Sequence, residues 1–159
     1  MNIHVICVGA PKESFYVEAA AEYEKRLKAY CKVSTVQIKD ERLSDKPSDA
    51  EIAAALKKEG EKILAALPPR AYKIAMCVEG KQLPSEKFAD LLHNTANNGF
   101  SDVAFIIGGS FGLAEEVKAA CDFRLSVSMM TFPHRMMKFI LLEQVYRAMN
   151  ILSGGKYHK

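Results

Sequence analysis

Apolar and polar residues alternate along this chain in blocks typical of a protein that mixes strands and helices. Five short runs rich in Val, Ile, Phe and Cys are bounded by Gly, Pro or charged residues, which is the pattern of buried strands. These runs predict strands over residues 3–9, 32–38, 72–78, 102–108 and 123–128.

Between these runs, apolar residues recur at helical spacing. Phe15, Ala19, Tyr23 and Leu27 form one apolar stripe, and Ser48, followed three residues later by a glutamate, forms a capping box. Pro133 is placed to open the last helix, since proline is favoured in a first helical turn. The pattern predicts helices over residues 13–30, 48–67, 85–96, 113–120 and 133–152.

Strands that alternate with helices predict one α/β domain over residues 1–159, with a mostly parallel sheet covered by helices on both faces. In such sheets, ligands bind beyond the carboxyl ends of the strands. Three loops meet that description, and they follow Val78, Ile107 and Ser128.

Composition places the chain among cytoplasmic globular proteins. Of its 159 residues, 49% are hydrophobic and 26% are charged, and no apolar run approaches the length of a membrane span. The first residues lack the basic start and the long apolar core of a signal peptide. The four cysteines are widely separated, without the paired spacing of a metal site or a disulfide framework. We therefore expect a cytoplasmic protein with no membrane anchor and no metal.

Positive charge is concentrated at the C-terminal end of the chain. Residues 124–159 contain six Lys or Arg and a single acid, Glu143, which gives that segment a charge of +5. The rest of the chain carries −2, and the whole chain has a net charge of +3. A basic end on a near-neutral body is typical of a protein with a polyanionic partner. A solvated basic tail without a partner would have the same composition.

The loop after the fourth predicted strand contains Gly108, Ser110 and Gly112, which fit the G-x-S-x-G motif of serine hydrolases. Asp122 and His134 follow in the chain order of a Ser-Asp-His triad, although they are close together and the chain is small for such an enzyme. The glycines alternatively allow a tight turn, or let a ligand approach the backbone. A phosphate-binding loop is disfavoured because no lysine follows the glycines.

The loop after the fifth predicted strand carries hydroxyls, thioethers and an aromatic ring, in the sequence SVSMMTFPHRMM. These groups suit an adenine ring and a thioether chain better than a phosphate. Alternatively, Met129, Met130 and Phe132 belong to the core. The last predicted helix is so apolar that we expect a second interface, most simply a homodimer.

Several of these segments together resemble one family. FIIGGSFGL, LSVSMMTFPHRMM, LLEQVYRAMNI and the terminal GGKYHK occur in the order and spacing of the bacterial ribosomal RNA large subunit methyltransferase H family, of the SPOUT class. The similarity extends to VGAPKESFY and KEGEKIL nearer the N-terminus. The resemblance implies a SPOUT-type fold with a C-terminal trefoil knot, and a homodimer that binds S-adenosyl-L-methionine. It also implies methylation of N3 of pseudouridine 1915 in helix 69 of 23S rRNA, on the assembled ribosome.

The resemblance also implies site residues. Cofactor-binding positions fall in three of the loops, on Met76, on Gly108 and on the run Val127, Ser128, Met129, Met130, Thr131 and Phe132. Arg147, Tyr157 and His158 match positions that approach the target base. The residue after Met76 is expected to be acidic, and here it is Cys77. A ribosome assembly factor that binds RNA without catalysis, and a hydrolase that uses Ser110, remain as alternatives.

Overall fold

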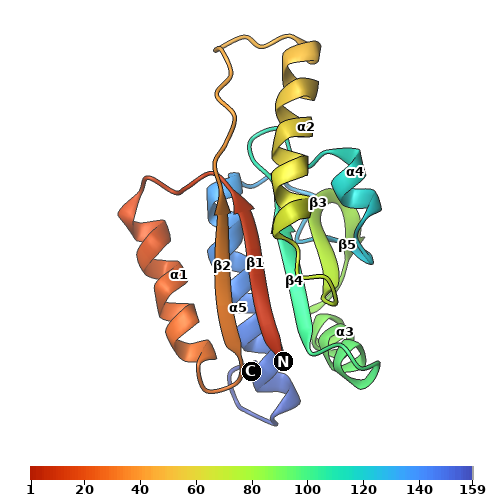
Figure 1. Cartoon of the computed structure of the whole chain (residues 1–159). Coiled ribbons are helices and arrows are strands. Elements are labelled where there is room, and N and C mark those ends of the chain that lie inside the picture. Colours follow the sequence, from red (N-terminus) through yellow and green to blue (C-terminus); the bar gives the residue numbers. More distant parts are fainter. Residues whose placement is uncertain (159) are drawn as a thin grey trace.

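The computed structural model, which describes residues 1–158, has a five-stranded sheet in which all neighbouring strands run parallel (Figure 1). The strand order is β2-β1-β4-β3-β5, so the chain crosses over between non-adjacent strands. The strands are β1 (Asn2–Val8), β2 (Lys32–Ile38), β3 (Tyr72–Gln82), β4 (Asp102–Ile107) and β5 (Phe123–Ser126). Because the strands are parallel, their carboxyl ends all lie at one edge of the sheet.

Helices cover both faces of this sheet, as the alternating pattern predicts. On one face, α5 packs between α1 and α3; on the other, α2 packs against α4. The helices are α1 (Ser14–Leu27), α2 (Asp49–Ala66), α3 (Ser85–Asn97), α4 (Glu115–Ala119) and α5 (His134–Leu152).

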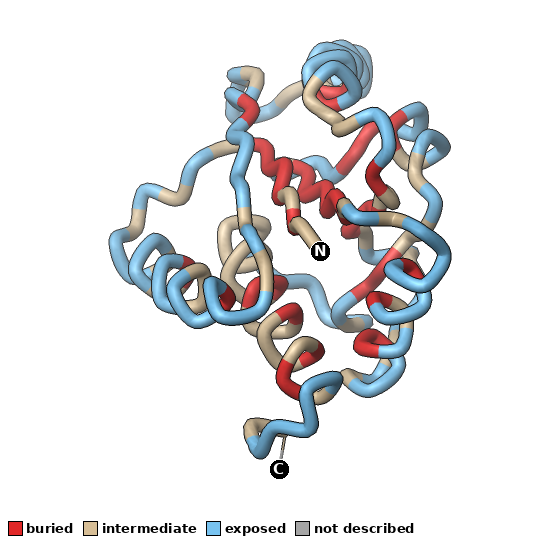
Figure 2. Tube along the Cα trace, turned by 60° about the horizontal axis from the view of Figure 1, so that its bottom comes forward, coloured by how far each residue is buried: buried red, intermediate tan, exposed pale blue. Residues whose placement is uncertain are grey.

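The core divides into two apolar layers, one on each face of the sheet. Successive side chains of β1 point to opposite faces of the sheet and so belong to different layers. Ile3 and Val5 face α1, α3 and α5, whereas Ile6 and Val8 face α2 and α4. Figure 2 shows the buried residues gathered along the strands and on the inner sides of the helices, while much of α2 is exposed. Apart from Asp102 at its start, β4 is apolar, and it is central and buried on both faces.

Several predicted boundaries differ from the structure. β3 runs four residues beyond Val78, and β5 ends at Ser126 because residues 127 and 128 leave the sheet. The prediction that Phe15 shares the buried stripe of α1 is wrong, since its side chain is 60% exposed. The predicted start of α3 at Ser85 is confirmed, with Pro84 as its N-cap, and the Ser85 hydroxyl donates to Gln144 of α5.

The capping box of α2 is confirmed. The amide of Glu51 donates to the Ser48 hydroxyl oxygen, and the amide of Ser48 donates to the Glu51 carboxylate at 2.8 Å. Within residues 1–158, no helix is long and apolar enough to cross a membrane. The described residues also contain no group of three or more His, Cys, Asp or Glu arranged to hold a metal ion.

Candidate functional site

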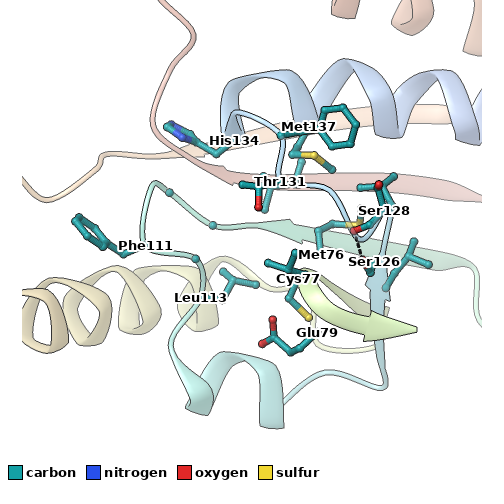
Figure 3. A pocket seen from close by; sticks show the side chains of 18 of the residues that line it. Met76, Cys77, Glu79, Phe111, Leu113, Ser126, Ser128, Thr131, His134 and Met137 are labelled. Atoms are coloured by element: carbon teal, nitrogen blue, oxygen red, sulfur yellow. Dashed lines mark hydrogen bonds between the residues drawn. The ribbon is translucent and has the colours of Figure 1, made fainter. Parts of the chain in front are cut away.

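Three loops at the carboxyl edge of the sheet surround a cavity of about 360 Å³ (Figure 3). They follow β4, β5 and the first part of β3, which are the three places that the strand pattern singled out. Side chains from the start of α5 and from α4 complete the wall. The cavity lies within the size range of small-molecule sites in proteins.

In the glycine loop after β4, the backbone at Gly108 lies in close contact with the backbone at Gly112. A Cβ atom on Gly108 would overlap the carbonyl group of Gly112, so no other residue fits without a shift of the loop. Gly112 has a φ of +80°, and its amide donates to the Gly109 carbonyl at 3.1 Å. The tight-turn interpretation is therefore right for Gly112, and Gly108 is required by a close approach within the chain. Ser110 is an exposed member of this loop.

The loop after β5 is folded by its own serines. The Ser126 hydroxyl donates to the Ser128 carbonyl at 3.0 Å, and the Ser128 hydroxyl accepts from the Met130 amide at 2.9 Å. Of the six residues from 127 to 132, all except Met129 line the cavity. Met129 lies outside it, with a side chain that is 88% exposed. The alternative that Met129, Met130 and Phe132 belong to the core is wrong, because all three are exposed.

The third wall comes from β3, where the strand bulges. Met76 and Lys81 both pair with Leu125 of β5, so residues 77–80 leave the ladder. Met76 is 8% exposed and lines the cavity together with Cys77 and Glu79. Sequence reasoning missed Glu79 and Lys118, and it named His134 only as the histidine of a possible hydrolase triad. Their positions depend on the crossovers of the chain, which no local pattern signals.

The lining combines apolar surfaces with a few hydrogen-bonding groups. Side chains such as Met76, Leu113 and Phe132 supply flat apolar walls, while hydroxyls and the loop backbones supply donors and acceptors. Burial lowers the pKa of His134, so its imidazole is neutral near pH 7. This arrangement fits a planar heterocycle that carries a polar chain.

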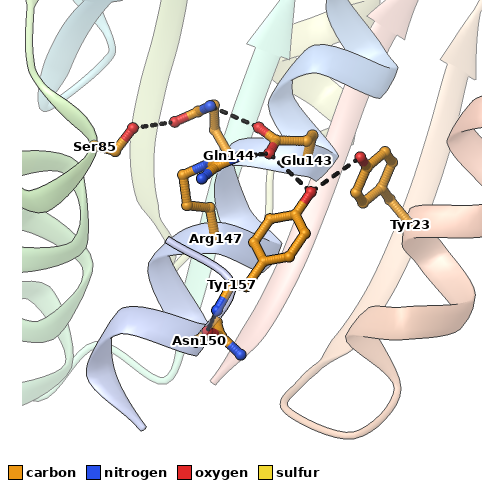
Figure 4. Close-up of polar contacts among 7 residues, drawn as sticks. All are labelled: Tyr23, Ser85, Glu143, Gln144, Arg147, Asn150 and Tyr157. Carbon is orange, nitrogen blue, oxygen red and sulfur yellow. Dashed lines mark hydrogen bonds and ion pairs between the residues drawn. The ribbon is translucent and has the colours of Figure 1, made fainter. Parts of the chain in front are cut away.

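A second group of polar side chains lies near the C-terminal end of α5 (Figure 4). Arg147 donates to the Glu143 carboxylate through Nε at 3.0 Å, and its guanidinium stacks over the Tyr157 ring at 4.6 Å. The Tyr157 hydroxyl donates to the same carboxylate at 3.2 Å and lies 3.2 Å from the Tyr23 hydroxyl. We call Tyr23, Glu143, Arg147 and Tyr157 the arginine cluster. In the sequence Glu143 stood out as the single acid of the basic segment, and in the structure its carboxylate links Arg147 and Tyr157.

The C-terminal residues are packed against the helices. The Tyr157 amide donates to Asn150 at 2.9 Å, and His158 Nε2 lies 2.9 Å from Glu86 at the start of α3. Hydrogen bonding with Tyr23, together with burial and the Glu143 charge, raises the pKa of the Tyr157 phenol. The phenol is therefore protonated at neutral pH and acts as a donor, not as a base. Lys159 lies outside the described residues.

Within one chain, the residues of the arginine cluster do not line the cavity beside the glycine loop. Arg147, Tyr157 and His158 do not line the cavity. Met137 is the last α5 residue that lines it, and ten residues at about 1.5 Å per residue place Arg147 about 15 Å further along the helix. A second cavity of about 440 Å³ adjoins the first, with which it shares Met76, Leu125, residues 126–128 and Phe132, and it extends between α3 and α5 to Gln144, which bonds to Glu143.

The structure does not assemble a serine hydrolase site. Ser110 and His134 both line the cavity at the carboxyl edge of the sheet. Asp122 instead accepts from the Lys73 amide at 2.7 Å, at the amino end of β3. The acid of the supposed triad is therefore at the opposite edge, and the hydrolase hypothesis loses its support.

The basic C-terminal segment is largely neutralised by acids from elsewhere in the chain. Arg124 pairs with Glu115, Arg135 with Glu13, and Lys138 with Glu24, while Arg147 pairs with Glu143 inside the segment. The excess of charge seen in the sequence is thus spread over ion pairs.

Comparison with known proteins finds full-length relatives. The family model described as predicted SPOUT methyltransferase matches residues 1–158. The ribosomal RNA large subunit methyltransferase H of Leuconostoc mesenteroides is 44% identical over 159 residues, 100% of both chains. The protein of the same name from Streptococcus sanguinis is 45% identical over the same span.

Solved structures share the fold at much lower identity. A probable methyltransferase from Bordetella pertussis aligns with a TM-score of 0.58 and 16% identity, covering 93% of this chain and 94% of that one. A putative methyltransferase from Legionella pneumophila, solved in complex with the bound cofactor SAM, aligns with a TM-score of 0.52 and 14% identity, covering 93% and 66%. These likenesses show a common α/β architecture.

Proposed function

Because this chain belongs to the SPOUT methyltransferase family, and within it to the ribosomal RNA large subunit methyltransferase H group, we propose that it methylates 23S rRNA with S-adenosyl-L-methionine as the methyl donor. The proposed target is N3 of the pseudouridine in the helix 69 loop, in the assembled ribosome and hence in the cytoplasm. Membership of this family is also our reason to propose that the chain forms a trefoil knot.

The observation that carries this proposal is the cavity formed by three loops that are far apart in the sequence. Met76, Gly108 and residues 127–132, the positions implied by family resemblance, come to one edge of the sheet, and all but Met129 line the cavity. Apolar walls and backbone groups in such a place fit the adenine and thioether parts of the cofactor. The neutral His134 adds no positive charge that would repel a sulfonium.

The arginine cluster is suited to activating the acceptor. When bound, S-adenosylmethionine supplies an electrophilic methyl group, and the acceptor nitrogen must give up its proton. N3 of pseudouridine lies between two carbonyls, so its anion places negative charge on their oxygens. The Arg147 guanidinium, whose pKa is raised by Glu143, remains a cation that stabilises this charge. Tyr157 and Glu143 orient the guanidinium, and His158, by its match to a family position, is proposed to position the base or to assist loss of the proton.

A homodimer would bring the two halves of the site together. In an antiparallel pairing of two α5 helices, the Arg147 end of one helix lies beside the cavity end of the other. Apolar side chains around the cavity are exposed in one chain, including Phe111 at 49% and Met130 at 73%, and a second copy would cover them. We therefore propose that each cofactor site is completed by the arginine cluster of the partner.

The test is methyl transfer to ribosomes from a bacterial strain that lacks its own helix 69 methyltransferase. We expect incorporation of a labelled methyl group from S-adenosylmethionine, mapped by mass spectrometry to one pseudouridine of helix 69. Free 23S rRNA should be a poor substrate, because the proposed target is the assembled ribosome. Absence of transfer, or transfer to another nucleotide, would overturn the proposal.

A ribosome-binding factor without catalysis is distinguished by the same experiment and by calorimetry. Such a protein would bind ribosomes but neither S-adenosylmethionine nor its product S-adenosylhomocysteine. We expect both compounds to bind.

A further inference from the structure

The cavity contains one carboxylate among the described residues that line it, and that carboxylate belongs to Glu79. The position that family resemblance predicts to be acidic, directly after Met76, is Cys77 in this chain. We propose that Glu79 supplies the carboxylate that position 77 lacks. In this proposal, Glu79 accepts hydrogen bonds from the ribose hydroxyls of the cofactor. This inference rests on the proposed function, since it assumes that the cavity binds S-adenosylmethionine.

The bulge in β3 presents Glu79 to the same cavity as Cys77. Met76 and Lys81 both pair with Leu125, so residues 77–80 between them leave the β-ladder. The side chains of Cys77 and Glu79 both line the cavity. Gly80 holds the bulge close to β5, because a Cβ atom there would lie 2.5 Å from the Leu125 carbonyl carbon. Figure 3 shows the Glu79 carboxylate beside Cys77, on the side of the cavity nearest Leu113.

An ion pair fixes the orientation of the Glu79 carboxylate. Lys118 of α4 donates to Glu79 Oε1 at 2.6 Å and also contacts Glu115 Oε2 at 3.0 Å. The hydrogen bond from Lys118 lowers the pKa of Glu79, which is therefore an anion and a pure acceptor. A carboxylate has more acceptor positions than one ammonium can fill, so Glu79 can still accept from a ligand hydroxyl.

The position and acceptor character of Glu79 suit the ribose hydroxyls of the cofactor. Glu79 is half-exposed, at the edge of a cavity whose interior is apolar, and the ribose hydroxyls are the pair of neighbouring O–H donors in the ligand. Acidic side chains bind ribose hydroxyls in this manner in dinucleotide sites. Cys77 cannot substitute, because burial raises the pKa of its thiol and a neutral thiol is a weak acceptor.

Glu115 provides a matched control for Glu79. Both carboxylates pair with Lys118, but Glu115 does not line the cavity. Calorimetry with S-adenosylhomocysteine would compare the wild type, Glu79→Gln and Glu115→Gln. We expect Glu79→Gln to weaken binding about tenfold or more, as for loss of a hydrogen bond to a charged group, and Glu115→Gln to change it less than about twofold.

A ligand lacking one ribose hydroxyl separates direct contact from an indirect effect. The wild type should bind 2′-deoxy- or 3′-deoxy-S-adenosylhomocysteine more weakly than the parent compound, and Glu79→Gln should lose most of that preference. Unchanged affinity of Glu79→Gln, or an undiminished preference for the intact ribose, would overturn the role of Glu79. Failure of the wild type to bind S-adenosylhomocysteine would instead overturn the proposed function.

Discussion

At the scale of single residues, the motif in the glycine loop predicted the place of the loop but not the role of each residue. The spacing of Gly108, Ser110 and Gly112 predicted a functional loop at the end of a strand, and the loop lines the cavity. It could not show that Gly108 is needed by a contact with Gly112, because that contact depends on how the loop folds back on itself. Ser110, the residue that the motif emphasises, is exposed and forms no part of a triad.

Replacement of Gly108 by alanine should impair cofactor binding. The added methyl group overlaps the Gly112 carbonyl and forces the loop to move, at a cost comparable to overpacking in a core. We expect affinity for S-adenosylhomocysteine, measured by calorimetry, to fall by about tenfold or more. Ser44→Ala, at an exposed loop position away from the cavity, is the control and should bind as the wild type does. Equal affinities for all three proteins would contradict this account of the loop.

Asp102 predicts a pH dependence of stability. At the amino edge of the sheet it accepts from Asn2 at 3.0 Å and Ser101 at 2.7 Å, and lies 2.8 Å from His4 Nε2. These contacts, His4 foremost, hold the pKa of Asp102 far below its usual range. A lowered carboxyl pKa stabilises the fold above the unfolded-state value, about 4, and this contribution is lost as the pH falls below it.

Urea denaturation at a series of pH values tests this dependence. Asp102→Asn should lower the unfolding midpoint at pH 7, and its difference from the wild type should shrink as the pH falls from 4 to 3. Asp45→Asn, at an exposed loop position, should unfold as the wild type does throughout. A difference that stays constant down to pH 3 would rule out this role of the Asp102 carboxylate.

At the scale of elements, the sequence predicted where helices and strands occur better than where they end. Ser48 and Glu51 carry a local capping signal, and the start of α2 follows from them. The bulge at residues 77–80 was not predicted: Gly80 is compatible with a bulge, but its close contact with β5 joins segments far apart in the sequence. Phe15 was misplaced because its neighbour Tyr16 is the residue that stacks on Phe139 of α5 at the start of α1, whereas Leu27 of the predicted stripe is buried.

Loss of the Ser48 cap should destabilise the protein measurably. Ser48→Ala removes the acceptor for the Glu51 amide and should lower the free energy of unfolding by about 1 kcal/mol. Urea denaturation at a fixed protein concentration measures the effect, with exposed Ser44→Ala as the control. Equal stabilities of the two variants would show that the capping box contributes nothing.

At the scale of the whole molecule, the sheet and its covering helices were predictable from alternation, whereas strand order was not. The order β2-β1-β4-β3-β5 decides that Met76, Gly108 and residues 127–132 lie together. The same crossovers leave Arg147 about 15 Å along α5 from that cavity. Neither the convergence of the loops nor this separation has a signature in local sequence. The separation is the physical reason to expect that two chains share each site.

Mixed dimers test most directly the central claim, that a cofactor held by one chain reacts beside Arg147 of another. Arg147→Ala and Gly108→Val, each inactive as a homodimer, would carry different affinity tags, so that the heterodimer is purified for methyl transfer to ribosomes. A shared site predicts that the heterodimer regains about half of the wild-type activity, since one of its two sites has an intact cavity and an intact arginine cluster. A site contained within one chain leaves every site in the heterodimer defective. An inactive heterodimer, in a preparation where the wild-type dimer is active, would contradict the account.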